Sequence, residues 1–284
     1  MSIDTNSSSM GSRSQGSNSA VSSLKDKVAL LTSSSPGTCV EIAVQLAQAG
    51  AKVVICGRNA NQGLATVRQI RAHGGRATFI LADIAVVADV KAMIDEAIAT
   101  YGRLDILINN ISNSYAQDAS VPDVSEAVWD RIMEPLLKGT FFCCQLAIPF
   151  LQQYQGGTII NLIDKTLGVS SQAVADICQG GVVAMTTAIA QQFNTSNVTA
   201  NMVWATPLSA QTLAGSQTID KTQLGLIAGE VLTHSAQTQL PFVSIREAVM
   251  YLAQQGHTLH GTALLVQTPE SSAASSSMPS STRS

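Results

Sequence analysis

The chain has 284 residues, 45% of them hydrophobic and 12% charged, with a formal net charge of -3. This length suits one large α/β domain or two small ones and is ample for a buried core. With only 16 lysines and arginines the sequence shows no basic stripe, which argues against a nucleic-acid partner. We find no apolar run of the roughly 18 residues that a membrane span requires and no signal segment, so we expect a soluble, cytoplasmic protein with no membrane partner.

The five cysteines argue against disulfides and against a metal site. They are an odd number, and none of them forms a CxxC pair or lies at metal-ligand spacing from a histidine. We therefore expect reduced cysteines that act as small core residues, and no bound metal.

Serine-rich, weakly hydrophobic segments lie at both ends of the chain, at residues 1–23 and 270–284. Such segments bury too little apolar surface to offset the entropy of ordering, so we expect them to be disordered tails. The intervening residues 24–269 are expected to form one domain.

Short apolar runs alternate with longer segments of helical periodicity along this domain. The expected strands are residues 28–32, 52–56, 77–81, 104–109, 158–162, 198–204 and 263–267. The expected helices are residues 37–50, 60–74, 86–101, 125–153, 173–193 and 244–255. Continuously apolar strands that alternate with helices indicate an α/β, Rossmann-type, doubly wound parallel sheet of about seven strands with helices on both faces. Ligands of such sheets bind beyond the carboxyl ends of the strands.

Several motifs occur along the domain at a consistent spacing. They are LKDKVALLT at 24–32, Gly37, Asp83, LDILINN at 104–110, WDR at 129–131, KGT at 138–140, GTIIN at 157–161 and the helix before the last strand. Together they resemble the short-chain dehydrogenase/reductase family across essentially the whole domain.

The resemblance implies a nicotinamide dinucleotide bound at a glycine-rich loop, here residues 32–39. Thr32 and the middle glycine, Gly37, match the family pattern, whereas Ser33 and Cys39 replace the other two glycines. Because bare glycines let the backbone and the helix N-terminus approach the pyrophosphate, we expect binding to be weakened or absent.

Three further positions match the cofactor side of the family. Asp83 corresponds to the residue that contacts adenine, and Asn109 corresponds to a strand-stabilising asparagine. Arg58 follows the second strand, where an acidic residue would select NAD, so any bound cofactor is expected to be NADP(H), held through its 2'-phosphate. A solvated arginine at the strand end remains the alternative.

The catalytic Asn, Ser, Tyr and Lys of the family have no counterpart in this sequence. By the spacing of the motifs, these positions hold Leu136, Asp164, Ala175 and Gln179. Loss of a general acid and of the lysine that tunes its pKa would slow hydride transfer by about 10²- to 10⁴-fold.

Two residues are candidate replacements in proton transfer. Asp164 replaces the serine among apolar neighbours, where a desolvated carboxyl would hold its proton more tightly, as a general acid does. An aspartate that caps or turns the following loop is the alternative. Tyr115, on the loop after the fourth strand, is the second candidate, and a tyrosine packed at the rim is its alternative.

The helices expected at 125–153 and 173–193 carry more apolar residues than one chain can cover. In the family these helices form a dimer bundle, so the resemblance implies a homodimer or homotetramer.

Three functions follow from these observations. The main expectation is a degenerate or repurposed member, a pseudoenzyme with little oxidoreductase activity. The second is a non-redox isomerase, dehydratase or cyclase that acts on an apolar small molecule through Asp164. The third is an NADP(H)-dependent reductase with substitute catalytic residues.

Overall fold

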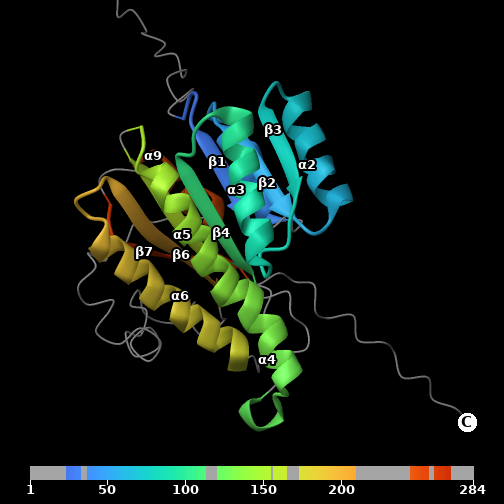
Figure 1. Ribbon diagram of the computed structural model, residues 1–284, viewed down its shortest axis with the longest axis vertical. Helices are drawn as coiled ribbons and strands as arrows, with labels where there is room; N and C mark the ends of the chain where they lie inside the picture. Colours follow the sequence, from blue (N-terminus) through green and yellow to red (C-terminus); the bar gives the residue numbers. More distant parts are fainter. Residues whose placement is uncertain are drawn as a thin grey trace, which may run out of the picture.

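The computed structural model describes residues 24–32, 37–112, 120–154, 156–164, 173–208, 244–255 and 259–269. Within these ranges seven strands form one sheet in the order β3-β2-β1-β4-β5-β6-β7 (Figure 1), and all six neighbouring pairs are parallel. The strands are β1 (Val28–Thr32), β2 (Lys52–Gly57), β3 (Arg76–Leu81), β4 (Ile106–Ser112), β5 (Gly157–Asp164), β6 (Val198–Leu208) and β7 (Ala263–Pro269). The predicted doubly wound parallel sheet is confirmed. The predicted tails, 1–23 and 270–284, lie outside the described residues, so the domain limits remain a prediction.

Helices connect the strands and cover both faces of the sheet. They are α1 (Thr38–Gln48), α2 (Ala60–Ala72), α3 (Val87–Tyr101), α4 (Glu126–Met133), α5 (Thr140–Leu151), α6 (Ala173–Gln192) and α9 (Ile245–Gln254). Polar caps mark several starts: the side chains of Asn59, Ser125 and Ser244 accept hydrogen bonds from the first turns of α2, α4 and α9. Such caps satisfy backbone N–H groups that have no partner within the helix.

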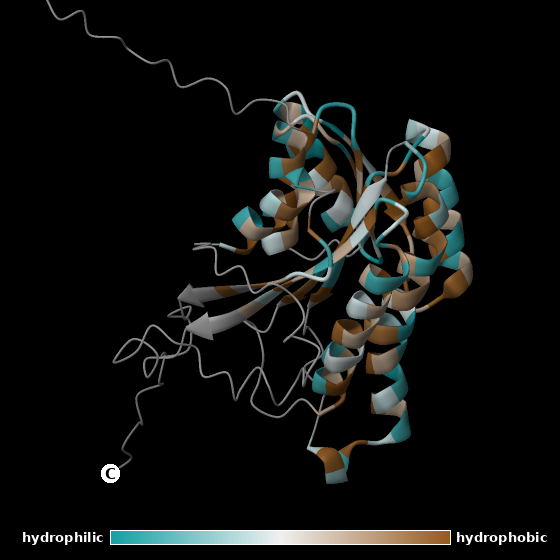
Figure 2. Cartoon of the chain, turned by 90° about the vertical axis from the view of Figure 1, so that its left-hand side faces the viewer, coloured by the Kyte–Doolittle hydropathy of each residue, from teal (hydrophilic) through white to brown (hydrophobic). Residues whose placement is uncertain are grey.

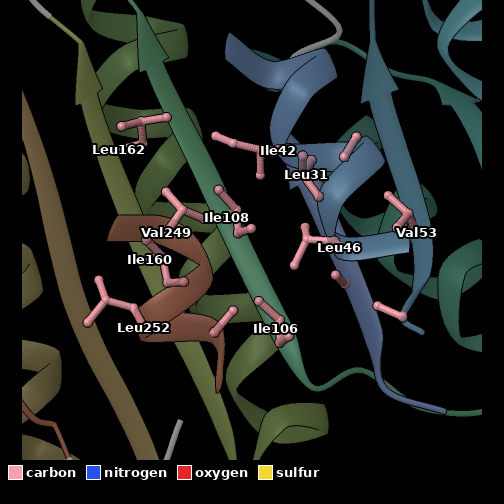
Figure 3. Close-up of a cluster of buried hydrophobic side chains, with 14 of the residues drawn as sticks. Leu31, Ile42, Leu46, Val53, Ile106, Ile108, Ile160, Leu162, Val249 and Leu252 are labelled. Atoms are coloured by element: carbon pink, nitrogen blue, oxygen red, sulfur yellow. The ribbon is translucent and has the colours of Figure 1, made fainter. Parts of the chain in front are cut away.

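Alternate residues of each strand serve two separate cores. Leu31 packs with α1, α2 and α9 on one face, and the adjacent Leu30 packs with α3, α5 and α6 on the other. Figure 3 shows the first core, in which Ile106 and Ile108 of β4 lie between Leu46 and Val249. This two-residue period explains why the strands read as unbroken apolar runs, since both faces are covered. Figure 2 colours the chain by hydropathy, and hydrophobic residues, in brown, occur both in the strands and in the helices around them.

The prediction of a single α-helix at 125–153 is wrong. The structure divides it into α4, a π-helical segment at Glu134–Gly139 and α5. Pro135 lies in this segment, and a proline inside a helix lacks the N–H that the regular pattern needs and collides with the preceding turn. The wider π turn accommodates this break. At its end, Gly139 lies so close to the backbone of Ile84 that an added Cβ would be 2.5 Å from the carbonyl oxygen.

We expected no apolar segment long enough to span a membrane, but α6 is long and apolar enough to do so by length and composition. Among the described residues it is the one helix long and apolar enough, with 20 residues and a mean hydropathy of 1.4. However, 56% of that apolar window is buried within the fold, as in the core helix of a globular domain. By itself the helix is weak evidence for a membrane partner.

Candidate functional site

The strand order reverses between β1 and β4, and this is where open α/β sheets bind their ligands. Chain connections lead in opposite directions from these two strands, and in sheets of this kind a ligand crevice forms outside the carboxyl ends at that point. Thr32, the last residue of β1, pairs in register with Asn109 of β4. Both side chains are buried. Two residues that the sequence assigned to the cofactor side therefore lie together at the switch point.

Hydrogen bonds hold the two strands together here. Thr32 Oγ1 lies 3.5 Å from Asn109 Oδ1 and accepts a hydrogen bond from the backbone N–H of Asn110 at 3.2 Å. Asn109 Nδ2 donates to Asn161 Oδ1 of β5 at 2.9 Å. Asn161 Nδ2 in turn donates to Thr186 Oγ1 of α6 at 2.8 Å. A buried polar row therefore joins β1, β4, β5 and α6 below the crevice.

The sequence analysis did not identify Asn161 and Thr186 as members of this row. A signal was present, because Asn161 interrupts an otherwise apolar run with a side chain that must find partners once buried. Its partners lie 52 and 25 residues away along the chain, so sequence alone could not name them.

The N-terminus of α1 also lies at this edge of the sheet. Gly37 is its N-cap residue, with φ 89° and ψ -128°, a left-handed conformation that favours glycine. A Cβ added at Gly37 would meet no atom of the described residues within 4 Å, so these residues leave the backbone open on that side. Cys39, expected to obstruct a ligand, has its side chain buried, with 5% exposed. Residues 33–36, which include Ser33, lie outside the described residues.

Arg58 and Asp83 lie beyond the ends of β2 and β3 and form an ion pair. Arg58 Nη1 is 3.7 Å from Asp83 Oδ2, with 68% of the arginine side chain exposed. Asp83 Oδ1 accepts a hydrogen bond from the backbone N–H of Ala85 at 3.0 Å. An exposed pair of this kind contributes little stability, so Arg58 is available to a stronger anion.

The structure also brings together positions that motif spacing assigned to the catalytic set of the family. Leu136 in the π segment and Ala175 in α6 belong to one buried apolar cluster with Ile111 of β4 and Ile163 of β5. Asp164, the last residue of β5, pairs in register with Ser112 and with Ala205 of β6. This register sets Asp164 at the carboxyl edge beside the cluster. Tyr115 lies outside the described residues.

Gln179 is the exceptional polar residue of this region. Its side chain is 1% exposed, and neither its Nε2 nor its Oε1 has a hydrogen-bond partner among the residues that the structure describes. Buried amides are almost always paired, because an unpaired one carries the full cost of desolvation. The sequence analysis identified the position of Gln179 but not this feature.

The described thiols do not form a nucleophilic centre. Burial raises the pKa of Cys144 to about 12, against a smaller lowering by the hydrogen bond from Asn109, and burial also raises the pKa of Cys143 well above its usual range. All five cysteines are buried and free of disulfides. No group of three or more potential metal ligands occurs among the described residues.

Comparisons with known proteins agree with this geometry. Residues 27–219 match the family described as short chain dehydrogenase. The chain belongs to this family.

Named relatives of the chain are enzymes. It is 35% identical over 181 residues, 63% of this chain and 72% of the relative, to the (2S)-[(R)-hydroxy(phenyl)methyl]succinyl-CoA dehydrogenase subunit BbsD of Thauera aromatica. It is 33% identical over 180 residues, 62% of this chain and 72% of the relative, to the 3-oxoacyl-[acyl-carrier-protein] reductase FabG of Staphylococcus aureus. These matches overturn the expectation of a pseudoenzyme with little oxidoreductase activity and favour the reductase alternative.

Solved structures confirm the fold of the chain. A short-chain dehydrogenase/reductase from Burkholderia xenovorans has a TM-score of 0.69 at 26% identity, covering 87% of this chain and 96% of that one. A metagenomic short-chain oxidoreductase in complex with NADP has a TM-score of 0.68 at 23% identity, covering 87% and 99%. The second likeness is one of fold alone. The family binds nicotinamide cofactors, which agrees with the expected class of cofactor.

Proposed function

We propose that this short-chain dehydrogenase is an NADP(H)-dependent reductase that converts the carbonyl of an apolar small molecule to an alcohol. The observation that carries the proposal is the arrangement at the switch point. Gly37, at the open N-terminus of α1, follows β1, and the exposed cation of Arg58 follows the neighbouring β2, both at the carboxyl edge beside the switch point between β1 and β4. Together they provide two attachment points for phosphate groups at one edge of the sheet.

The residues present fit such a cofactor. A helix N-terminus favours a pyrophosphate through its N–H groups and dipole, and the Gly37 backbone leaves room for close approach. Arg58 would bind the 2'-phosphate, and Asp83 would contact the adenine. Thr32 and Asn109 would stabilise the ends of β1 and β4 beneath the cofactor. We expect reduced affinity relative to members with three glycines, because Ser33 and Cys39 carry side chains in the same loop.

When bound, the reduced cofactor supplies a hydride to the carbonyl carbon. The chain must supply a proton to the carbonyl oxygen so that the product is a neutral alcohol. Asp164 and Tyr115 are the proposed proton donors, since Ala175 cannot donate. The apolar cluster around Leu136 and Ile163 would exclude water from this part of the carboxyl edge.

The assembly is proposed to be a cytoplasmic homodimer or homotetramer. Apolar side chains remain exposed on α4, α5 and α6, namely Trp129 (38%), Phe141 (46%) and Ile177 (48%). A second copy of the chain would cover them.

Titration of the purified protein with NADPH and NADH, followed by thermal unfolding, tests the cofactor. A ligand at 100 times its Kd stabilises the folded state by about 2.7 kcal/mol, so NADPH should raise the Tm and NADH should raise it less. If neither nucleotide shifts the Tm at millimolar concentration, the proposal fails.

The proton donors are tested by the pH dependence of ketone reduction in Asp164→Asn and Tyr115→Phe. Removal of the true donor should lower kcat by about 10²- to 10⁴-fold and remove one limb of the pH profile. An unchanged profile in both variants would exclude both residues.

A further inference from the structure

Helix and strand geometry place Gln179 near the height of the carboxyl edge of the sheet. Thr186 lies opposite Asn161 of β5, because their side chains are hydrogen-bonded. Gln179 precedes Thr186 by two helical turns on the same buried face of α6, a rise of about 10.5 Å. Asp164 lies a similar distance, about 10 Å, beyond Asn161 along β5. The amide and the end of β5 are therefore at the same height.

The neighbouring polar side chains of this face are already paired. Thr186 Oγ1 accepts from Asn161 and donates to the carbonyl oxygen of Val182 at 2.7 Å. The Asn161 amide is occupied by Thr186 and Asn109. One turn above Gln179, toward the start of α6, Ala175 contributes only a methyl group. No group of the chain, as the structure describes it, pairs with the Gln179 amide.

An amide in this state makes the folded protein less stable than an apolar side chain of similar volume would. Such a cost is typical of residues kept for function. We propose that Gln179 is a substrate-specificity residue, whose carboxamide hydrogen-bonds the hydroxyl of an apolar, uncharged alcohol. This inference rests on the proposed reductase function, of which the alcohol is the product.

Two features select this chemistry. The carboxamide is neutral and offers one donor side and one acceptor side, and a hydroxyl complements both, whereas a ketone only accepts. The surrounding side chains Val174, Cys178, Val182 and Val183 are apolar, so the rest of the ligand must be apolar too. A carboxylate or phosphate would be desolvated there without a counter-charge from the amide.

The test compares the wild type with Gln179→Met and with the matched control Gln191→Met, which changes an exposed glutamine on the same helix. The first measurement is the Tm of the ligand-free proteins. Gln179→Met should be as stable as the wild type or more stable, and Gln191→Met should be unchanged. If both Gln179→Met and Gln179→Leu lose several degrees or fail to fold, the amide is already satisfied internally and the inference is overturned.

The second measurement is binding of 1-phenylethanol and of its ketone, acetophenone, with and without NADP⁺. The wild type should bind the alcohol more tightly than the ketone, and Gln179→Met should lose this preference, with the Kd for the alcohol raised about 3- to 10-fold. Equal alcohol affinity in both proteins, or no alcohol binding by the wild type, overturns the inference.

A third measurement, NADPH binding, distinguishes the reductase proposal from the proposed role of Gln179. If Gln179→Met weakens NADPH and leaves the alcohol unaffected, the hydroxyl belongs to the sugar of the cofactor and the substrate assignment is wrong. If the wild type binds neither NADPH nor NADH, the reductase proposal fails, and the alcohol arm still decides the role of Gln179.

Discussion

Asn161 and Thr186 join β5 to α6 through one buried hydrogen bond, in which Nδ2 donates to Oγ1 at 2.8 Å. Both side chains are almost fully buried. The bond fixes the height of α6 against the sheet and therefore the height of Gln179 at its carboxyl edge.

Thr186→Val should destabilise the protein, because it leaves the Asn161 N–H group buried without an acceptor. The expected loss is about 1–3 kcal/mol in the free energy of unfolding, measured by urea denaturation. Thr187→Val is the matched control, since Thr187 is only partly buried and bonds the carbonyl of its own helix at 3.1 Å. Its effect should stay within about 0.5 kcal/mol. Equal losses in both variants would contradict a special role for the Asn161–Thr186 bond.

Arg58→Ala should weaken NADPH about tenfold and leave NADH nearly unchanged, because only NADPH carries the 2'-phosphate that the guanidinium would bind. Isothermal titration with both nucleotides measures the ratio. Arg68→Ala, at an exposed position on α2, controls for the loss of one positive charge. A parallel loss of both nucleotides in Arg58→Ala would show that Arg58 does not read the 2'-phosphate.

Asp105 should make stability depend on acid pH. It is 3% exposed at the amino-terminal edge of the sheet, with Lys27 Nζ at 3.1 Å and Arg103 Nε at 2.8 Å. Burial alone raises its pKa, but hydrogen bonds from Arg103, the Val28 N–H and Lys27 outweigh burial and hold the pKa below its ordinary value of 3.8. The carboxylate therefore stabilises the fold above pH ~4, and this stabilisation is lost as the pH falls through the lowered pKa.

Asp105→Asn should cost about 1–3 kcal/mol at pH 7, with the difference from the wild type shrinking below pH ~4. Unfolding by urea at several pH values measures this. Asp95→Asn is the control, because Asp95 forms an exposed pair with Lys91 on α3 that contributes little. A difference that grows toward acid pH would contradict the lowered pKa.

Gly139→Ala should disrupt the junction between the π segment and α5. The added Cβ would lie 2.5 Å from the Ile84 carbonyl oxygen, and a backbone atom cannot move aside cheaply. We expect a loss of several kcal/mol, in the range of severe overpacking. Gly180→Ala is the counterpart, since its Cβ meets nothing within 4 Å and alanine favours a helix by about 1 kcal/mol. Thermal unfolding of both variants should therefore give shifts of opposite sign.

The sequence alone determined the architecture, and it named the residues expected at the cofactor edge. The alternation of apolar runs with helical segments predicted all seven strands, because a parallel sheet covered on both faces requires strands of that composition. The segment near 125–153 was expected to be one α-helix, because its apolar periodicity continues through Pro135. The structure instead has a π-helical segment there, which this periodicity does not reveal. Thr32, Gly37 and Asn109 were recognisable because their positions follow from the local motifs.

Only the tertiary structure decided which polar groups are paired. The partners of Asn161 come from β4 and α6, and the unpaired amide of Gln179 became evident only once its described neighbours were in place. Hydrogen bonding of buried groups depends on contacts between residues far apart in the chain. The local sequence does not show which of these residues come close together in space. The match to named dehydrogenases and reductases overturned the expectation of a pseudoenzyme, which had rested on the residues at positions such as Ala175 and Gln179.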